Sequence, residues 1–318
     1  MPQETTGVVT ATVLNVRPEP NTTKPPIGQL VRGTNVAIIA RSGAWYRIEN
    51  GLVQGFVHGD FIKINESAPV TGFLHERPEL KQVSLIPTDA DGIPLPSRST
   101  PAQRLAAGVW NSFGGMLKIV SRILGVNEGA SVAIICVESS GQGMGPDGRM
   151  IIRFENHIFW KEWGSRHANE FNQHFRFNQA KRWTGHMFRQ NAQSSWQTFH
   201  GRQVDEWRVF DFARGLHERA AMLSISMGLP QIMGFNFAGI GYESVEEMFN
   251  AFQGDIRYQI LGLFDFIKGA GTTSPMLTAL QRRRYEDFAA RYNGPGQAAA
   301  YGARIASHVE AFESLKRG

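Results

Sequence analysis

The sequence predicts two domains of different class, a small all-β barrel followed by a mainly α-helical domain with a short β-hairpin. Three observations support this division. Short β-rich runs broken by Pro and Gly fill residues 1–65, a segment rich in Pro, Ser, Thr and Asp covers 66–99, and capped helical patterns occupy much of 100–318. With 318 residues, the chain is long enough for about two hydrophobic cores.

The first 65 residues contain six runs rich in β-branched and aromatic residues, and turn residues separate them. The expected strands are Val8–Val16, Ile27–Val31, Asn35–Ala40, Trp45–Glu49, Gly51–Val57 and Phe61–Ile64. Short strands in this arrangement favour a small barrel. The following segment, 66–99, has no sustained period and is longer than an ordinary loop, so we expect a linker, either free or packed in part on one neighbour.

Three helix starts are marked in the second domain. Thr100-Pro101 places a capping residue before a proline, and the helix that it opens is expected to run to Leu124. Ser244 and Glu247 have the spacing of a capping box, and one apolar face continues from there to Phe264. Ser274-Pro275 opens a third helical pattern, whose apolar positions recur as far as Tyr292.

Charge and composition limit the partners without choosing among them. A net charge of +5 and a pI near 9.5 favour an anionic partner such as nucleic acid, lipid head groups or bacterial wall polymer. No basic-aromatic motif indicates nucleic-acid binding, and no apolar run predicts membrane insertion. Met1–Leu14 does not read as a signal peptide and Cys136 has no cysteine to pair with, so we expect synthesis and folding in the cytoplasm.

One carboxylate stands out because of what precedes it. The run Ser131–Val137 is too apolar for a surface segment, and it leads directly into Glu138 and then Ser139-Ser140-Gly141. Apolar surroundings disfavour the charged form of a carboxyl group and raise its pKa, which lets a glutamate act as a general acid. From this pattern alone, a solvated or hydrogen-bonded structural glutamate remains the alternative.

The first 65 residues resemble bacterial Src-homology-3-like domains, which often bind cell-wall peptides or glycans. The resemblance rests on Leu14–Arg17, Gly28–Leu30, Gly33-Thr34, Trp45–Ile48 and Gly55–His58. It implies a wall-binding barrel, with a spacer or packing role as the alternative.

The remainder resembles the N-acetylmuramidase domain of phage endolysins and bacterial wall hydrolases. Four segments in order carry this resemblance: Val137–Gly141, Arg153–Phe159, Ser224–Gly234 and Arg291–Gly296. More distantly, the pattern resembles goose-type lysozymes and lytic transglycosylases. This similarity implies a lysozyme-like helical fold.

The same resemblance implies roles for individual residues. Glu138 would be the acid, and Tyr292 with Asn293 would face its carboxyl group. Ser226, Gln231 and Met233 would line the sugar subsites, although simple core packing is an equal alternative for Met233.

A second carboxylate would decide the mechanism. Inverting glycosidases place a base about 6.5–9.5 Å from the acid and retaining enzymes place a nucleophile about 5 Å away, whereas lytic transglycosylases need neither. Glu155 is the candidate, because it ends a β-like run that begins at Arg149 after a glycine-rich turn and could form a hairpin. Asp147 is the fallback, and an ion pair of Glu155 with a nearby arginine is the structural alternative.

No metal or other cofactor is expected. His217-Glu218 is followed by Arg, Ala and Ala, so it is not a zinc-binding His-Glu-x-x-His motif, and the chain has one cysteine. His157 shares a strand face with Glu155 if the strand continues, and we interpret it as a hydrogen-bonding or substrate-contacting residue. Cys136 lies inside the apolar run, where thiols are inert.

Together these features predict a monomeric peptidoglycan hydrolase, a bacteriolytic phage endolysin or antibacterial enzyme. It would cleave the β-1,4 bond between N-acetylmuramic acid and N-acetylglucosamine, reaching the wall through holin-type release, lysis or injection. One alternative is a lytic transglycosylase that gives anhydro-muramic products. Another is a non-catalytic wall-binding protein.

Overall fold

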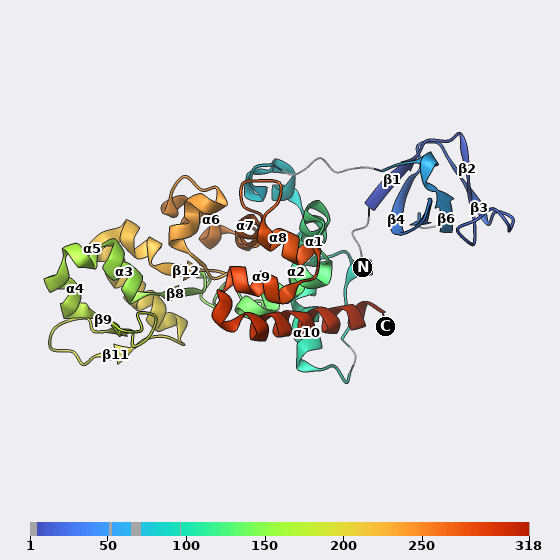
Figure 1. Ribbon diagram of the computed structural model, residues 1–318. Coiled ribbons are helices and arrows are strands. Elements are labelled where there is room, and N and C mark those ends of the chain that lie inside the picture. The colour runs from blue at the N-terminus through green and yellow to red at the C-terminus, as the bar shows by residue number, and fades with distance from the viewer. Residues whose placement is uncertain (1–4, 51–52, 65–70, 96, 318) are drawn as a thin grey trace. The chain divides into compact units, whose positions relative to one another are not determined.

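The computed structural model describes residues 5–50, 53–64, 71–95 and 97–317 (Figure 1). The chain divides into two compact units, one made of 1–70 with 118–128 and the other of 71–117 with 129–318. The part of the expected linker at 66–70 lies outside the described residues, as do Gly51 and Leu52 of one expected strand.

The first unit is built from antiparallel strands. A five-stranded sheet has the order β6-β5-β4-β1-β7, and a separate pair, β2-β3, is connected to it by a bridge between Arg17 and Phe56. These strands are β1 (Thr5–Val9), β2 (Val13–Val16), β3 (Gly28–Val31), β4 (Asn35–Ser42), β5 (Trp45–Glu49), β6 (Gln54–His58) and β7 (Ile62–Ile64). The all-β prediction is confirmed. The first expected strand is two strands, because the chain changes pairing partner between Val9 and Val13.

Alternation along these strands builds one core. Val36 and Ile38 of β4, Ile48 of β5 and Val57 of β6 are buried, while their sequence neighbours are more exposed. The full set of buried apolar residues is Val9, Leu14, Val16, Leu30, Val36, Ile38, Ile48, Val57 and Ile62. This unit therefore has its own hydrophobic interior.

The second unit is mainly helical, as predicted (Figure 1). Its α-helices are α1 (Pro101–Leu124), α2 (Glu128–Ser139), α3 (Asn156–Glu162), α4 (Ala168–His174), α5 (Gln203–Leu223), α6 (Val245–Gly254), α7 (Ile256–Lys268), α8 (Pro275–Gln281), α9 (Tyr285–Tyr292) and α10 (Ala298–Arg317). Short strands are β8 (Ile152–Phe154), β9 (Phe175–Arg176), β10 (Met187–Phe188), β11 (Gln197–Thr198), β12 (Ile225–Met227) and β13 (Ile232–Met233). Figure 1 shows α3, α4, β9 and β11 at one end of this unit, α2, α9 and α10 at the other, and β8 and β12 between them.

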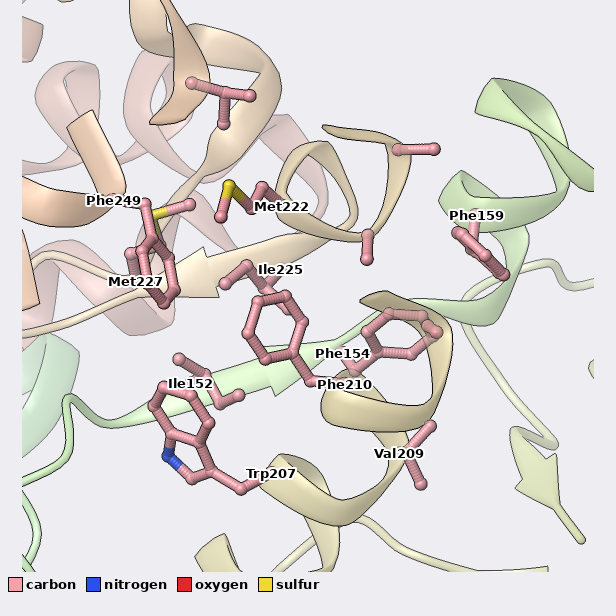
Figure 2. Close-up of a cluster of buried hydrophobic side chains, with 14 of the residues drawn as sticks. Ile152, Phe154, Phe159, Trp207, Val209, Phe210, Met222, Ile225, Met227 and Phe249 are labelled. Carbon is pink, nitrogen blue, oxygen red and sulfur yellow. The ribbon is translucent and has the colours of Figure 1, made fainter. Parts of the chain in front are cut away.

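A small antiparallel sheet, β13-β12-β8, forms the centre of the unit. Ile152 and Phe154 of β8 belong to a buried cluster that also contains Ile225 and Met227 of β12 and Phe210 of α5 (Figure 2). Side chains at the start of α5 also form hydrogen bonds with the backbone of β8. The Gln203 amide accepts from the Ile152 N–H and donates to the Ile152 carbonyl, both at 2.9 Å, and a Glu206 oxygen accepts from the Phe154 N–H at 2.9 Å. Since β8 is an edge strand, these bonds replace a missing neighbour strand.

The predicted helix starts are confirmed, but two predicted helices are interrupted. Thr100 and Gln103 exchange reciprocal capping hydrogen bonds at the start of α1, and Ser244 accepts from the Glu247 N–H at the start of α6. The apolar face after Ser244 is divided between α6 and α7, because Asp255 caps a new helix there. The third pattern is divided between α8 and α9, and Arg283 between them has a φ of 54°.

The segment from Phe73 onward packs on the helical unit. It contains three 3-10 helices, η2 (Leu74–Glu76), η3 (Pro78–Gln82) and η4 (Asp89–Asp91), and Leu74 and Leu80 are fully buried. The carboxylate of Asp265 in α7 accepts from the N–H of Leu74 at 2.6 Å and of His75 at 3.1 Å, and contacts His75 Nδ1 at 2.9 Å. This part of the expected linker is therefore attached to one neighbour. The remaining 3-10 helices of the unit are η5 (Gly164–Arg166), η6 (Gly234–Ile240) and η7 (Pro295–Gln297).

We predict that Asp265→Ala lowers the free energy of unfolding of the helical unit by about 3–5 kcal/mol, because it leaves two buried N–H groups and a histidine without their acceptor. Urea denaturation followed by far-ultraviolet circular dichroism measures this change. The control is Asp287→Ala, an exposed carboxylate paired with Arg284, which should cost less than about 1 kcal/mol. Equal effects of the two substitutions would contradict the anchoring role of Asp265.

Candidate active site

Glu138 lies in the last turn of α2, a helix whose residues Gly129–Val137 are all buried. The helix ends abruptly because Ser140 and Gly141 have positive φ angles of 52° and 78°. Gly141 also lies close to α1, where a Cβ atom would come within 2.9 Å of Val109 Cγ2. A buried helix with a sharp end therefore presents the half-buried Glu138 side chain at the margin of the core.

The environment of Glu138 favours its protonated form. Burial raises the pKa of this carboxyl group to about 7, and it outweighs two opposing effects, a hydrogen bond from Asn293 and the positive charge of Arg304. The Asn293 amide donates to Glu138 Oε1 at 3.4 Å, and an Arg304 Nη2 donates to the Val137 carbonyl at 3.4 Å. Near neutral pH, Glu138 is therefore a mixture of acid and carboxylate.

Two tyrosines accompany this carboxyl group. Burial and then the charge of Glu138 raise the pKa of Tyr301, and the same two causes, with Tyr301 as a third, raise that of Tyr292 well above its usual value. The Tyr292 hydroxyl donates to the Pro230 carbonyl at 3.1 Å. Tyr292 thus connects the end of α9 to the turn between β12 and β13.

That turn contains the predicted subsite residues. Ser226 Oγ donates to Gln231 Oε1, and Gln231 Nε2 donates to the Gly228 carbonyl, both at 2.8 Å. Gln231 has a φ of 50°, and Ser226 pairs with Met233 across the β12–β13 ladder. These contacts fix the shape of the turn, while the half-buried Met233 stays partly accessible. The structure thus connects Glu138, Asn293, Tyr292 and this turn in one region.

A residue that the sequence analysis did not identify holds this region together. The buried side chain of Gln259 in α7 accepts from the Leu229 N–H and donates to the Phe252 carbonyl, each at 2.8 Å. A Cβ atom on Gly143 or Gly228 would lie 2.3 Å or 2.4 Å from its Oε1. The Gln259 side chain therefore fits because Gly143 and Gly228, which lie against it, have no Cβ atom. The available signal was a glutamine within the apolar face of a predicted helix.

Glu155 and His157 belong to a different group of side chains. Glu155 precedes α3, and its Oε1 accepts from Arg153 Nε at 2.8 Å. His157 Nδ1 and His186 Nδ1 each lie 3.4 Å from Glu155 Oε2. Burial is the main cause that lowers the pKa of both histidines. The contacts of Glu155 are thus with one arginine and two histidines, and those of Glu138 are with Asn293.

Asp147 and Cys136 have structural environments. Asp147 Oδ2 accepts from Arg149 Nε at 2.8 Å and Oδ1 from the Arg149 N–H at 3.1 Å, and these bonds lower the pKa of the exposed carboxyl group. The turn that they stabilise closes a hairpin through a bridge between Met144 and Met150, while β8 itself pairs with β12. Burial raises the pKa of the Cys136 thiol to about 12, so no reactive thiolate forms near neutral pH.

Comparison with known proteins assigns the family. The family model described as N-acetylmuramidase matches residues 128–313, which is more than half of the chain. The chain belongs to the N-acetylmuramidase family. Residues 12–63 match the bacterial SH3 domain. The structure is also similar to the crystal structure of the Burkholderia AP3 phage endolysin, with a TM-score of 0.48, 24% sequence identity, and coverage of 64% of this chain and 70% of that one.

No curated protein matches the sequence. Because it belongs to this family, the muramidase is a peptidoglycan hydrolase that acts on the bacterial cell wall, as the sequence predicted. Among the described helices, none is both long and apolar enough to cross a membrane.

We predict that Glu138→Gln stabilises the muramidase at alkaline pH. The pKa of Glu138 is about 7 in the folded chain against 4.5 for the free group, so the folded state binds the proton more tightly and loses stability as pH rises from about 4.5 to 7. Above pH 7 the variant should be more stable than the parent by about 1–3 kcal/mol. This gain should shrink as the pH falls and stop changing below about pH 4.5, where the Glu138 carboxyl group is protonated in the folded and the unfolded parent alike. Urea titrations across this range measure it. A difference that does not change with pH would show that Glu138 titrates normally.

Proposed function

We propose that this muramidase hydrolyses the β-1,4 bond between N-acetylmuramic acid and N-acetylglucosamine, with Glu138 as the general acid. The observation that carries the proposal is a half-buried carboxyl group at the end of α2, whose pKa is raised by desolvation to about 7. A glycosidic oxygen needs a proton as its bond to the sugar carbon breaks, and a carboxylic acid that is protonated near neutral pH can supply it.

Asn293 and Arg304 would stabilise the Glu138 side chain after it has given up its proton. In transferring its proton, Glu138 becomes a carboxylate, and the Asn293 amide and the Arg304 charge both favour that form. Burial therefore keeps the proton on Glu138 before the reaction, and these two groups stabilise the anion after it. Ser226, Gln231 and Met233 are proposed to lie along the sugar subsites, and Tyr292 to position the turn that carries them.

The fate of the sugar cation distinguishes two reactions. In hydrolysis, water attacks the sugar carbon and a base takes its proton, and Glu155 is the predicted base. In a lytic transglycosylase, a hydroxyl group of the muramic acid attacks instead and returns a proton to Glu138. The contacts of Glu155 with Arg153, His157 and His186 favour this second candidate, since it requires no second carboxylate.

The remaining proposals concern the whole chain. We propose that it works as a monomer, with 1–65 as a wall-binding domain, 66–99 as the connection and 100–318 as the catalytic domain. The net charge of +5 would assist binding to an anionic wall. Synthesis in the cytoplasm followed by holin-type release, lysis or injection would bring it to its substrate.

We predict that Glu138→Gln lowers the rate of sacculus clearing by a factor of about 10²–10⁴ while sacculus binding persists, because only the transferable proton is lost. Turbidity measures clearing, and co-sedimentation measures binding. Glu310→Gln, an exposed change on α10, is the matched control and should behave like the parent. Clearing by Glu138→Gln at the parental rate would refute the acid. Mass spectrometry of the parental products then separates reducing muramic ends from anhydro ends.

We also predict that clearing by the parent declines as pH rises through about 7, because the acid form of Glu138 is lost. In Asn293→Ala, this alkaline decline should move to higher pH, since the hydrogen bond that lowers the pKa of Glu138 is removed. Initial rates measured in buffers of constant ionic strength provide the profile. A shift to lower pH would contradict the proposed effect of Asn293.

A further inference from the structure

Four buried side-chain atoms around Glu155 have no hydrogen-bond partners among the described residues. They are Glu155 Oε2, His157 Nδ1, His186 Nδ1 and His200 Nε2. Ligand atoms of Glu155, His186 and His200 all lie within 4.8 Å of one another, and the His186 side chain has no exposed surface. Buried polar atoms are nearly always satisfied, so a group of four in one place indicates a missing partner.

The spacing of these atoms suits a metal ion better than direct hydrogen bonds. His157 Nδ1 and His186 Nδ1 are each 3.4 Å from Glu155 Oε2, whereas charge-assisted hydrogen bonds are about 2.7–2.9 Å long. Tetrahedral zinc with bonds of about 2.0–2.1 Å separates its ligand atoms by about 3.4 Å. The rings are also neighbours, with centroid distances of 5.5 Å for His157–His186 and 5.0 Å for His186–His200.

Surrounding groups orient two of the imidazoles for binding. His186 Nε2 lies 2.9 Å from the Arg182 carbonyl, and His200 Nδ1 lies 2.8 Å from Glu206 Oε1. Both partners are acceptors, so these nitrogens carry the hydrogen atoms, and the opposite nitrogens have free lone pairs. Histidines that bind metals commonly donate to a carboxylate or a backbone carbonyl in this way. Glu206 is itself fixed, because its other oxygen accepts from the Phe154 N–H.

We propose that Glu155, His186 and His200 bind a zinc ion that stabilises the lobe 156–201. Imidazole nitrogens and one carboxylate are typical zinc ligands, whereas calcium and magnesium prefer oxygen alone. Three protein ligands leave the fourth position of a tetrahedral zinc ion to a water molecule.

The regular elements of the lobe are short. Its strands β9, β10 and β11 have two residues each, and its helices α3 and α4 have seven each. Glu155 immediately precedes the lobe, His186 immediately precedes β10, and His200 follows β11. One ion would therefore connect both ends of the lobe. It would also occupy the Glu155 oxygen that a catalytic base would need, while Arg153 keeps the other.

The test titrates the full chain, stripped with a chelator and dialysed, with Zn²⁺ alone by isothermal calorimetry. We expect one ion per chain with submicromolar affinity, and at least 100-fold weaker binding for His186→Ala, His200→Ala and the near-isosteric Glu155→Gln. Glu206→Gln should weaken binding about 10–100-fold by releasing His200. His174→Ala is the matched control, since this histidine belongs to the same lobe and contacts the Arg189 carbonyl at 3.1 Å. It should bind like the parent.

Thermal melting provides a second measurement. A chelator should lower the melting temperature of the parent and of His174→Ala, but not that of Glu155→Gln, whose folding is checked by circular dichroism. The site is refuted if the parent binds no Zn²⁺, or if Glu155→Gln and His186→Ala bind it as tightly as the parent. Glu138→Gln should bind the ion normally, so this result is independent of the proposed hydrolysis.

Discussion

The chemistry that we propose for this muramidase depends on the desolvation of one carboxyl group. Glu138 holds a proton near neutral pH because the α2 residues before it are buried, and because the helix ends at once through Ser140 and Gly141. Asn293 favours the opposite charge state across a distance of 3.4 Å. An acid needs both influences, since a carboxyl group that is only buried would keep its proton and a fully solvated one would lose it too early.

The position of that carboxyl group relies on polar atoms that carry out no chemistry. Gln259 holds the Gly228-Leu229 turn through its amide and fits against Gly143, so the loop after Glu138 and the turn before Gln231 share one buried contact. Tyr292 attaches the same turn to α9 through the Pro230 carbonyl. Fixed backbone geometry of this kind would suit the proposed site for a long polymer, because binding would have to align each sugar bond with the proposed acid.

Features that depend on residues close together in the sequence were predicted, and contacts between distant parts of the chain were not. Capping residues at Thr100, Ser244 and Ser274 located helix starts, because capping acts within one turn. The apolar period continued through Asp255, so it could not reveal the break between α6 and α7. Glu138 was visible from the buried run before it. Gln259 acts across about 30 residues, and the ligands from Glu155 to His200 follow no compact motif, so neither contact could be predicted from spacing.

The two glutamates show how environment assigns different tasks to one residue type. Glu138 has a weak amide contact, and burial raises its pKa to about 7, which suits the proposed transfer of its proton. Glu155 has a guanidinium at one oxygen and imidazole nitrogens at the other, an arrangement that uses the carboxylate as a fixed anion. A second carboxylate in this sequence neighbourhood therefore need not be a base. If Glu155 holds the lobe in place through a metal ion, the water attack proposed for hydrolysis needs a base other than Glu155, whereas the transglycosylase alternative needs none.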